Sequence, residues 1–311
     1  MFNSERKATV ILVATTMIAA LGWIFSKETI QGLPPFGFIG LRFTIASLCL
    51  LPLCYRPLKA ARLKDVLAAS GVGLLLGGAV MTWIYAISIS DTLGEGAFIM
   101  SLSMLFVPIV AWVMFQQRPQ RIFWISLPIA VIGLACLSLA GGWKQSASQL
   151  WFLGAALILA LHFNVNSKYS QKLPVLLLTC VQLFSAGCLG LLVSFLMESR
   201  PEQVDSSIWW WFALSTLLAT SLRYVMQTMG QKFVQAGNAA LIMILEPVWT
   251  VVLSILWYGE VLTANKLVGC LLILFFFGDL PHWRQIPLPE ASVNTRSKDE
   301  RRWQILNIKK H

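Results

Sequence analysis

Five ionisable side chains lie inside or at the ends of long apolar runs, and they are the residues of this chain best placed to do chemistry. They are Arg42, Glu95, His162, Arg223 and Glu246. A charged side chain at the centre of a bilayer costs about 2.5–3.5 kcal/mol on insertion scales, so a chain that keeps several of them there is expected to use them. Neutral amide side chains accompany them at Asn164, Asn166, Gln182 and Gln227.

His162 and Glu246 give the sharpest functional hypothesis. At a helical rise of about 1.5 Å per residue, His162 lies about 18 Å from one membrane face and Glu246 about 15 Å from the other, so both fall near the middle of a bilayer core. There they could exchange protons with a substrate, and Asn166, one turn beyond His162, could hold a substrate carboxylate or amine. In the alternative, Glu246 bonds to backbone freed by Pro247 and His162 is a satisfied core residue.

A polar stripe at helical spacing accompanies Arg223; it consists of Thr216, Thr220, Arg223 and Gln227. The stripe makes Arg223 and Gln227 candidate substrate residues. Arg223 lies near the expected cytoplasmic end of its segment, so it could equally anchor that end at the interface.

Four other side chains have both a structural and a functional interpretation. Arg42 is expected to pair with a carboxylate or with helix-end carbonyls. Glu95 either faces a central cavity or is a first-turn carboxylate favoured by the helix dipole. Trp23 and Trp83 lie deep enough to wall a substrate cavity, although packing against lipid is an equal alternative.

The composition requires that apolar elements position these residues inside a membrane. The chain has 311 residues, of which 57% are hydrophobic and 12% charged, against about 45–50% and 25% in soluble domains. The fold class expected is all-α and integral to the membrane. Ten spans are predicted, at residues 8–26, 35–53, 66–88, 93–115, 121–140, 149–167, 173–197, 207–229, 233–257 and 264–280.

The distribution of Lys and Arg predicts that both termini are cytoplasmic. With the N-terminus inside, 18 of the 24 basic residues fall on cytoplasmic segments and four on outer ones, while Arg42 and Arg223 lie within spans. The net charge of +10 then suits anionic lipid headgroups and needs no nucleic-acid partner.

An internal repeat relates the two halves of the chain. Shifting the sequence by 143 residues aligns GEGAFIMSL at 94–102 with GNAALIMIL at 237–245, and shorter matches recur at nearly the same offset. Spans 1–5 therefore correspond to spans 6–10. Because five is odd, the halves cross the membrane in opposite directions, which makes them inverted repeats. Such repeats typically build alternating-access transporters with a site at the midplane between the halves.

The chain resembles the EamA-type members of the drug/metabolite transporter superfamily. The resemblance rests on Gly22-Trp23, on Arg42-Phe43, on the start of span 4 and on AGNAALIMILEPVWTVVLSILWYGEVLT at 236–263, with its Glu246-Pro247 pair. It implies two EamA-like repeats at 1–145 and 146–282, followed by a basic tail at 283–311 that is expected to be disordered. Span 4 departs from the pattern, with Ser103-Met104 where the repeat places Glu246-Pro247.

The resemblance implies a secondary transporter in the cell (inner) membrane. Such a protein would export small metabolites, such as amino acids or related compounds, driven by a proton or substrate gradient. No cofactor is expected: the ATP-binding pattern GxxxxGK[ST] is absent, and the six cysteines form neither a CxxC pair nor a metal-spaced cluster. The chain could assemble as a homodimer.

The sequence leaves two other functional classes open. An integral membrane enzyme acting on lipid-linked substrates would need a concentration of catalytic residues near one interface, and only three His are present. A receptor or scaffold without transport is compatible with the sequence, but its short loops leave little surface for partners.

The topology is tested by fusing a reporter that is active only outside the cytoplasm to the C-terminus. We expect no activity from that fusion, because the Lys/Arg asymmetry places both termini inside. An active fusion would mean an odd number of spans and would contradict the repeat.

Overall fold

The computed structural model describes residues 2–90, 93–119, 121–139, 146–199, 204–259 and 261–279. The side chains of residues 2–5, 93–95, 121–122, 125–126 and 276–279 are excepted, so the Glu95 side chain and the predicted tail lie outside the described residues. Every regular element in the described ranges is a helix, which confirms the all-helical prediction.

The helices are α1 (Phe2–Thr29), α2 (Pro35–Ala60), α3 (Leu63–Ser88), α4 (Leu93–Phe115), α5 (Arg121–Ser138), α6 (Ser148–Ser170), α7 (Val175–Met197), α8 (Ser206–Thr216), the π-helix η1 (Leu217–Leu222), α9 (Arg223–Phe233), α10 (Ala236–Met243), α11 (Glu246–Tyr258) and α12 (Ala264–Asp279). Each predicted span coincides with one of these helices, except that spans 8 and 9 are interrupted. Span 8 consists of α8, η1 and α9, and span 9 of α10 and α11.

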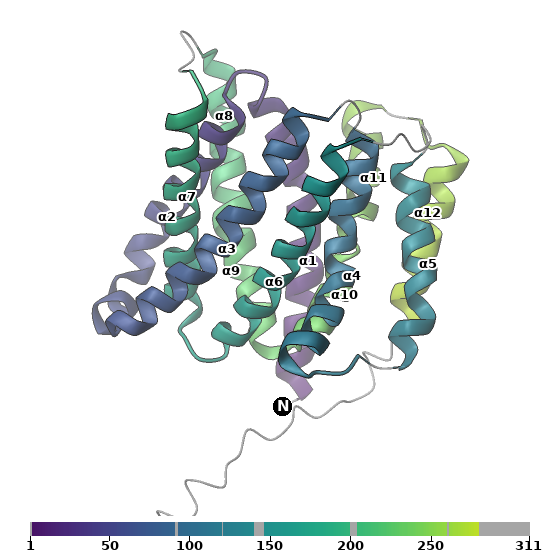
Figure 1. Ribbon diagram of the computed structural model, residues 1–311, viewed down its shortest axis with the longest axis horizontal. Coiled ribbons are helices and arrows are strands. Elements are labelled where there is room, and N and C mark those ends of the chain that lie inside the picture. The colour runs from purple at the N-terminus through teal and green to yellow at the C-terminus, as the bar shows by residue number, and fades with distance from the viewer. Residues whose placement is uncertain are drawn as a thin grey trace, which may run out of the picture. The chain divides into compact units, whose positions relative to one another are not determined.

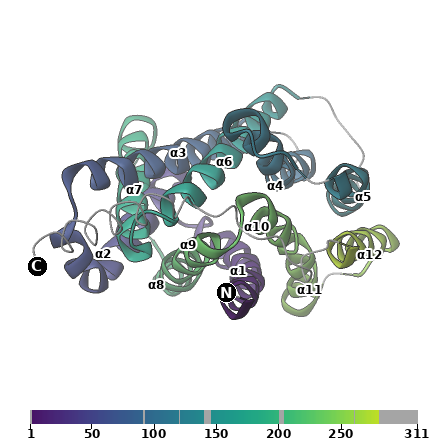
Figure 2. The same cartoon turned by 90° about the horizontal axis from the view of Figure 1, so that it is seen from below.

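The helices of the unit Met1–Asp279 form two rows (Figures 1 and 2). One row contains α3, α6 and α4, and the other contains α8, α9, α1, α10 and α11. Helix α2 packs along α7 at one end of the rows, and α5 packs along α12 at the other. The two rows also pack on each other, since α4 contacts α10 and α6 contacts α9.

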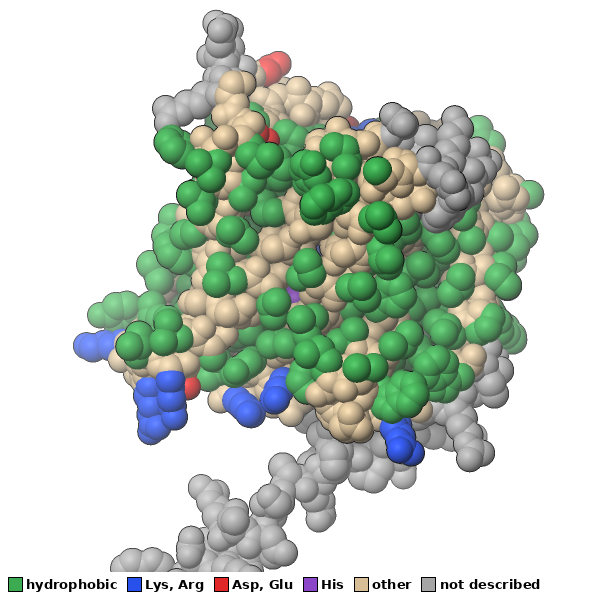
Figure 3. Space-filling model, viewed as in Figure 1, with side chains coloured by type: hydrophobic (Ala, Val, Ile, Leu, Met, Phe, Trp, Pro, Cys, Tyr) green, Lys and Arg blue, Asp and Glu red, His purple; other side chains and the backbone are tan. Residues whose placement is uncertain are grey.

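Seven helices in the described ranges are long and apolar enough to cross a membrane. Two further apolar helices, Leu127–Ser138 and Ala264–Phe275, are shorter. Large apolar side chains stand exposed on the outside, for example Leu53, Phe195 and Leu256. Figure 3 shows these side chains covering the visible face, with Lys and Arg gathered along its lower edge. An apolar belt of this kind is what a lipid-facing surface requires.

Two hydroxyl groups explain the π-helix within span 8. Thr220 Oγ1 donates to Ser215 O at 2.9 Å, and Ser221 Oγ donates to Thr216 O at 3.0 Å, each five residues back. These bonds support the widened turn that η1 forms. Span 8 then continues to Phe233, so Arg223 lies ten residues, or about 15 Å, before its end. Arg223 therefore lies farther from the end of this segment than the predicted span 207–229 implies.

A proline explains the break within span 9. Helix α10 ends at Met243, two residues form a turn, and α11 begins at Glu246 with Pro247 in its first turn. Proline has no backbone N–H to donate and is tolerated at a helix start, so the chain restarts its helix there. The break places the Glu246 carboxylate at the N-terminus of a half-helix inside the bundle.

Glycines allow α2 and α7 to approach closely. A methyl group added at Gly40 would come within 2.5 Å of Leu191 N, and one at Gly190 within 2.9 Å of the Gly40 Cα. Small residues at such positions are the usual means of helix packing in membranes. At the end of the same pair, the Glu198 carboxylate accepts hydrogen bonds from Phe36 N (2.8 Å) and Gly37 N (2.7 Å), which caps α2.

Replacing Gly40 by Ala should destabilise the protein, because the new methyl group meets backbone atoms that cannot move aside. We expect a loss of about 1–3 kcal/mol, seen as a lower midpoint of thermal unfolding in detergent. Gly71→Ala is the matched control, since a Cβ at Gly71 meets nothing within 4 Å. Equal melting of the two variants would contradict the close packing of α2 on α7.

Candidate functional site

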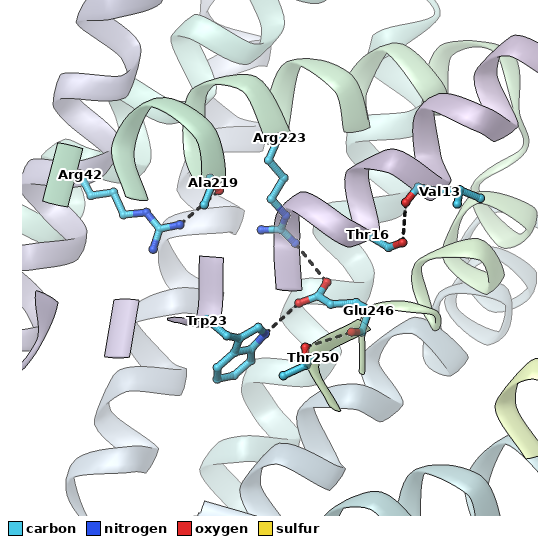
Figure 4. A network of polar contacts seen from close by, with 8 residues as sticks. All are labelled: Val13, Thr16, Trp23, Arg42, Ala219, Arg223, Glu246 and Thr250. Carbon is cyan, nitrogen blue, oxygen red and sulfur yellow. Dashed lines mark hydrogen bonds and ion pairs between the residues drawn. The ribbon is translucent and has the colours of Figure 1, made fainter. Parts of the chain in front are cut away.

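The Glu246 carboxylate joins three helices at the break in span 9 (Figure 4). Its Oε1 accepts a hydrogen bond from Trp23 Nε1 of α1 at 3.0 Å, and its Oε2 lies 3.5 Å from Arg223 Nη2 of α9. Thr250 Oγ1 donates to the Glu246 carbonyl at 3.0 Å, one turn into α11. We call Trp23, Trp83, Arg223 and Glu246 the central cluster.

Trp83 completes the central cluster from the opposite row of helices. The Trp23 and Trp83 rings meet edge to face, with centroids 5.9 Å apart and planes at 88°. The cluster is open to solvent: the side chains of Arg223 and Glu246 are each 22% exposed, and Trp23 is 45% exposed. It therefore combines a cation, an anion and two indole rings in partly exposed positions.

Arg223 uses little of its hydrogen-bonding capacity in the cluster. A guanidinium carries five N–H donors, and the contact with Glu246 at 3.5 Å is longer than a good charge-assisted hydrogen bond. The Nε–H of Arg223 is buried without a hydrogen-bond partner. An oxyanion entering the site could engage these donors while Glu246 is displaced or protonated.

Arg42 is held by neutral groups of span 8 and α1. Its Nε donates to Thr220 Oγ1, its Nη1 to Ser26 Oγ at 2.9 Å, and its Nη2 to Ala219 O at 3.2 Å. The widened turn of η1 presents two of these acceptors. No carboxylate of the described residues lies within 4.0 Å of Arg42. The sequence predicted a carboxylate or helix-end carbonyls, whereas the carbonyl that Arg42 contacts, that of Ala219, lies inside η1 and not at a helix end.

A second polar network lies buried where α6, α7 and α9 meet. His162 Nε2 and Gln182 Oε1 are 3.2 Å apart, and Gln182 Nε2 donates to Thr228 Oγ1 at 3.5 Å. Asn166 Nδ2 donates to Gln231 Oε1 and, at 3.4 Å, to Thr228 Oγ1. Within this network His162 Nδ1 and Asn166 Oδ1 have no partner.

The sequence candidates thus separate into two groups. Trp23, Trp83, Arg223 and Glu246 come together, whereas His162 and Asn166, each 1% exposed, lie in the sealed second network. Gln227 lies buried on α9 one turn after Arg223, and the side chain of Glu95 lies outside the described residues. Sequence reasoning missed Thr228 and Gln231, although their four-residue separations from Tyr224 and Gln227 continue a polar helical pattern.

Comparison with known proteins gives the family. The family model described as the EamA-like transporter family matches residues 6–139 and 146–277. The chain belongs to this family. The family and the names of its relatives indicate a membrane transporter and not an enzyme.

The relatives of this EamA-like protein share its length but are distant in sequence. A protein of Archaeoglobus fulgidus named as an uncharacterized transporter is 24% identical over 249 residues, covering 80% of this chain and 77% of the relative. The uncharacterized transporter YoaV of Bacillus subtilis is 22% identical over 273 residues, covering 84% and 92%. A solved crystal structure aligns with a TM-score of 0.74 at 16% identity, covering 87% of this chain and 95% of that one, which shows the fold alone.

A double-mutant cycle tests the contact between Arg223 and Glu246. We expect Arg223→Gln and Glu246→Gln each to lower the midpoint of thermal unfolding. The double variant should lose less stability than the sum of the losses in the two single variants. The coupling should be about 1 kcal/mol, because the pair is only partly buried. The control pairs Glu246→Gln with Lys64→Gln, a charge at the start of α3, and should be additive. Additivity in both cycles would mean that the ion pair contributes nothing to stability.

Proposed function

We propose that this EamA-like protein is a secondary transporter that exports small metabolites, such as amino acids or related compounds, by alternating access. In this proposal the chain crosses the cell membrane ten times as two inverted repeats, and the central cluster binds the solute. The observation that carries the proposal is the pairing of the helices.

Most of the helix pairs recur when spans 1–5 are exchanged with spans 6–10; the contact of α6 with α9 is an exception, since α1 and α3 form no corresponding pair. Spans 3 and 6 pack together as α3 on α6, and the exchanged spans 8 and 1 pack together as α8 and α9 on α1. Spans 4 and 6 pack together as α4 on α6, and the exchanged spans 9 and 1 as α10 and α11 on α1. Two further pairs, α2 with α7 and α5 with α12, each join a span of one half to the matching span of the other half, so the exchange leaves them the same. Two repeats related by a two-fold axis would produce this pattern, and the symmetry gives two packings of similar energy, each open to one side.

Two cation–π contacts support the same relation. Lys27 Nζ lies 4.1 Å from the centre of the Tyr258 ring, and Lys168 Nζ lies 5.0 Å from that of Phe115. The lysines occupy matched positions in the sequence repeat, and the rings are separated by its offset of 143. The contacts join the ends of α1 and α11 in one case, and of α6 and α4 in the other.

The distribution of charge supports the proposed orientation. Figure 1 shows the start of α1 and the connection between α2 and α3 at the lower edge, where Figure 3 shows Lys and Arg. A basic edge at one end of an apolar belt is expected of the cytoplasmic side. This supports a cytoplasmic N-terminus. In the proposal the Lys/Arg count and the even number of spans place the C-terminus on the same side, and the solute moves from that edge to the opposite one.

Glu246 is proposed to couple transport to a proton or substrate gradient. It faces Arg223, the only charged group among the described side chains within 4.0 Å, and the indole of Trp23. Protonation of Glu246 would remove its charge attraction to Arg223 and leave that guanidinium free for a solute. The His162 network, with its two unpartnered polar atoms, remains a proposed second contributor to coupling.

Uptake into proteoliposomes tests the proposal. Vesicles containing the full-length protein would be assayed with individual labelled amino acids and related carboxylic acids, with and without a pH gradient. We expect saturable uptake of at least one compound, and Glu246→Gln should lower its rate at least about tenfold and remove its dependence on the pH gradient. Asp65→Asn, which removes a carboxylate at the start of α3, should leave both unchanged.

Two results would contradict this. Absence of uptake of every compound argues against transport of this class. Full uptake by Glu246→Gln with the same pH dependence as the unsubstituted protein would make Glu246 structural.

A further inference from the structure

The described interior of the bundle carries a surplus of positive charge. Arg42 and Arg223 supply two permanent cations, and Glu246 supplies one carboxylate. Protonation of Glu246 or of His162 would only increase the surplus. A charge held in a medium of low dielectric constant without a counterion is costly, so an arriving anion would be stabilised there.

Arg42 is the cation without a counterion among the described residues. It is 8% exposed, and its three hydrogen-bond acceptors are two hydroxyl oxygens and a backbone carbonyl. Hydroxyl and carbonyl dipoles orient the guanidinium but do not cancel its charge. These three neutral acceptors fix the position of Arg42 and leave the positive charge of its guanidinium group uncompensated, so that charge would attract an anion bound close to it.

One turn of α1 connects Arg42 to the central cluster. A Cβ built at Gly22 would lie 3.9 Å from Arg42 Nη2, and Ser26 accepts from Arg42 Nη1. Trp23, the residue after Gly22, donates to Glu246. Figure 4 shows Arg42 beside Ala219, and Arg223 pointing at the Glu246 carboxylate that Trp23 also contacts. A solute at Trp23 is therefore within the field of both guanidinium groups.

We propose that the central cluster selects solutes with a net negative charge, binding their carboxylate or other oxyanion at Arg223 while Arg42 supplies the surplus charge. This inference rests on the proposed function and narrows its substrate class. A cationic solute would meet two guanidiniums. A zwitterion could match Arg223 and Glu246 but would leave Arg42 without a counterion.

Binding of a matched series of amino acids tests the charge preference. The full-length protein in nanodiscs of phosphatidylcholine, which have no net charge, would be titrated with glutamate, its neutral isostere glutamine, lysine and succinate. The signal is the change in tryptophan fluorescence that Trp23→Phe abolishes. We expect glutamate or succinate to bind at least about tenfold more tightly than glutamine, and lysine to give no saturable change.

A carboxylate introduced at Ser26 would give Arg42 a counterion while keeping the arginine in place. Ser26→Asp places a carboxylate where a hydroxyl now accepts from Arg42, and should reduce the preference for glutamate over glutamine at least about tenfold. Ser26→Asn is the matched control of nearly equal size and no charge, and should keep the preference. Arg42→Gln should act like Ser26→Asp where it folds, and Lys64→Gln, which removes a surface charge, should have no effect.

The outcomes separate this inference from the transport proposal. Equal or tighter binding of glutamine or lysine would overturn the selectivity for anions, and a preference for glutamate that survives Ser26→Asp would overturn the role of Arg42 as its source. Both results leave transport standing. Absence of a Trp23-dependent response to glutamate and succinate would overturn it as well. Uptake into proteoliposomes decides independently whether the protein transports at all.

Discussion

Within a bilayer every backbone polar group must find a partner inside the protein, and the irregular parts of this structure depend on that requirement. The widened turn in span 8 is supported by Thr220 and Ser221, whose hydroxyls bond to carbonyls five residues back. The break in span 9 is possible because Pro247 has no N–H to satisfy. In each irregular turn, nearby residues thus reduce the number of unpaired backbone groups. Arg223 directly follows the first turn and Glu246 the second, so each turn is followed by a charged side chain.

The two irregularities lie against the same helix. Helix α1 contacts η1 through Gly22 and contacts the start of α11 through Trp23. Its Ser26 bonds to Arg42 from α2. Polar groups of four spans therefore meet around one turn of α1, while the surrounding contacts are apolar. A small displacement of α1 would alter several of these contacts together.

The buried network around His162 differs from the central cluster in kind. Its members bond mainly to one another and are closed to solvent, whereas Trp23, Arg223 and Glu246 are partly exposed and keep donors free. A closed network fixes how α6, α7 and α9 pack, and its unpartnered atoms show that the present packing does not satisfy it fully. The open cluster is better suited to exchange partners with a solute.

The sequence by itself determined the helical class, the helix boundaries to within a few residues in most spans, and the family, and it named Trp23, Trp83, Arg223 and Glu246, which the structure brings together, as candidates. Hydrophobic length and the cost of buried charge act locally, so a single sequence records them. It could not determine which charges meet. Arg42 was expected to pair with a carboxylate or with helix-end carbonyls, and only the tertiary structure showed that its partner is a carbonyl inside the π-helix, 177 residues away. The separation of His162 from Glu246 into different networks likewise depends on how α6, α9 and α11 rotate against their neighbours, which long-range packing decides.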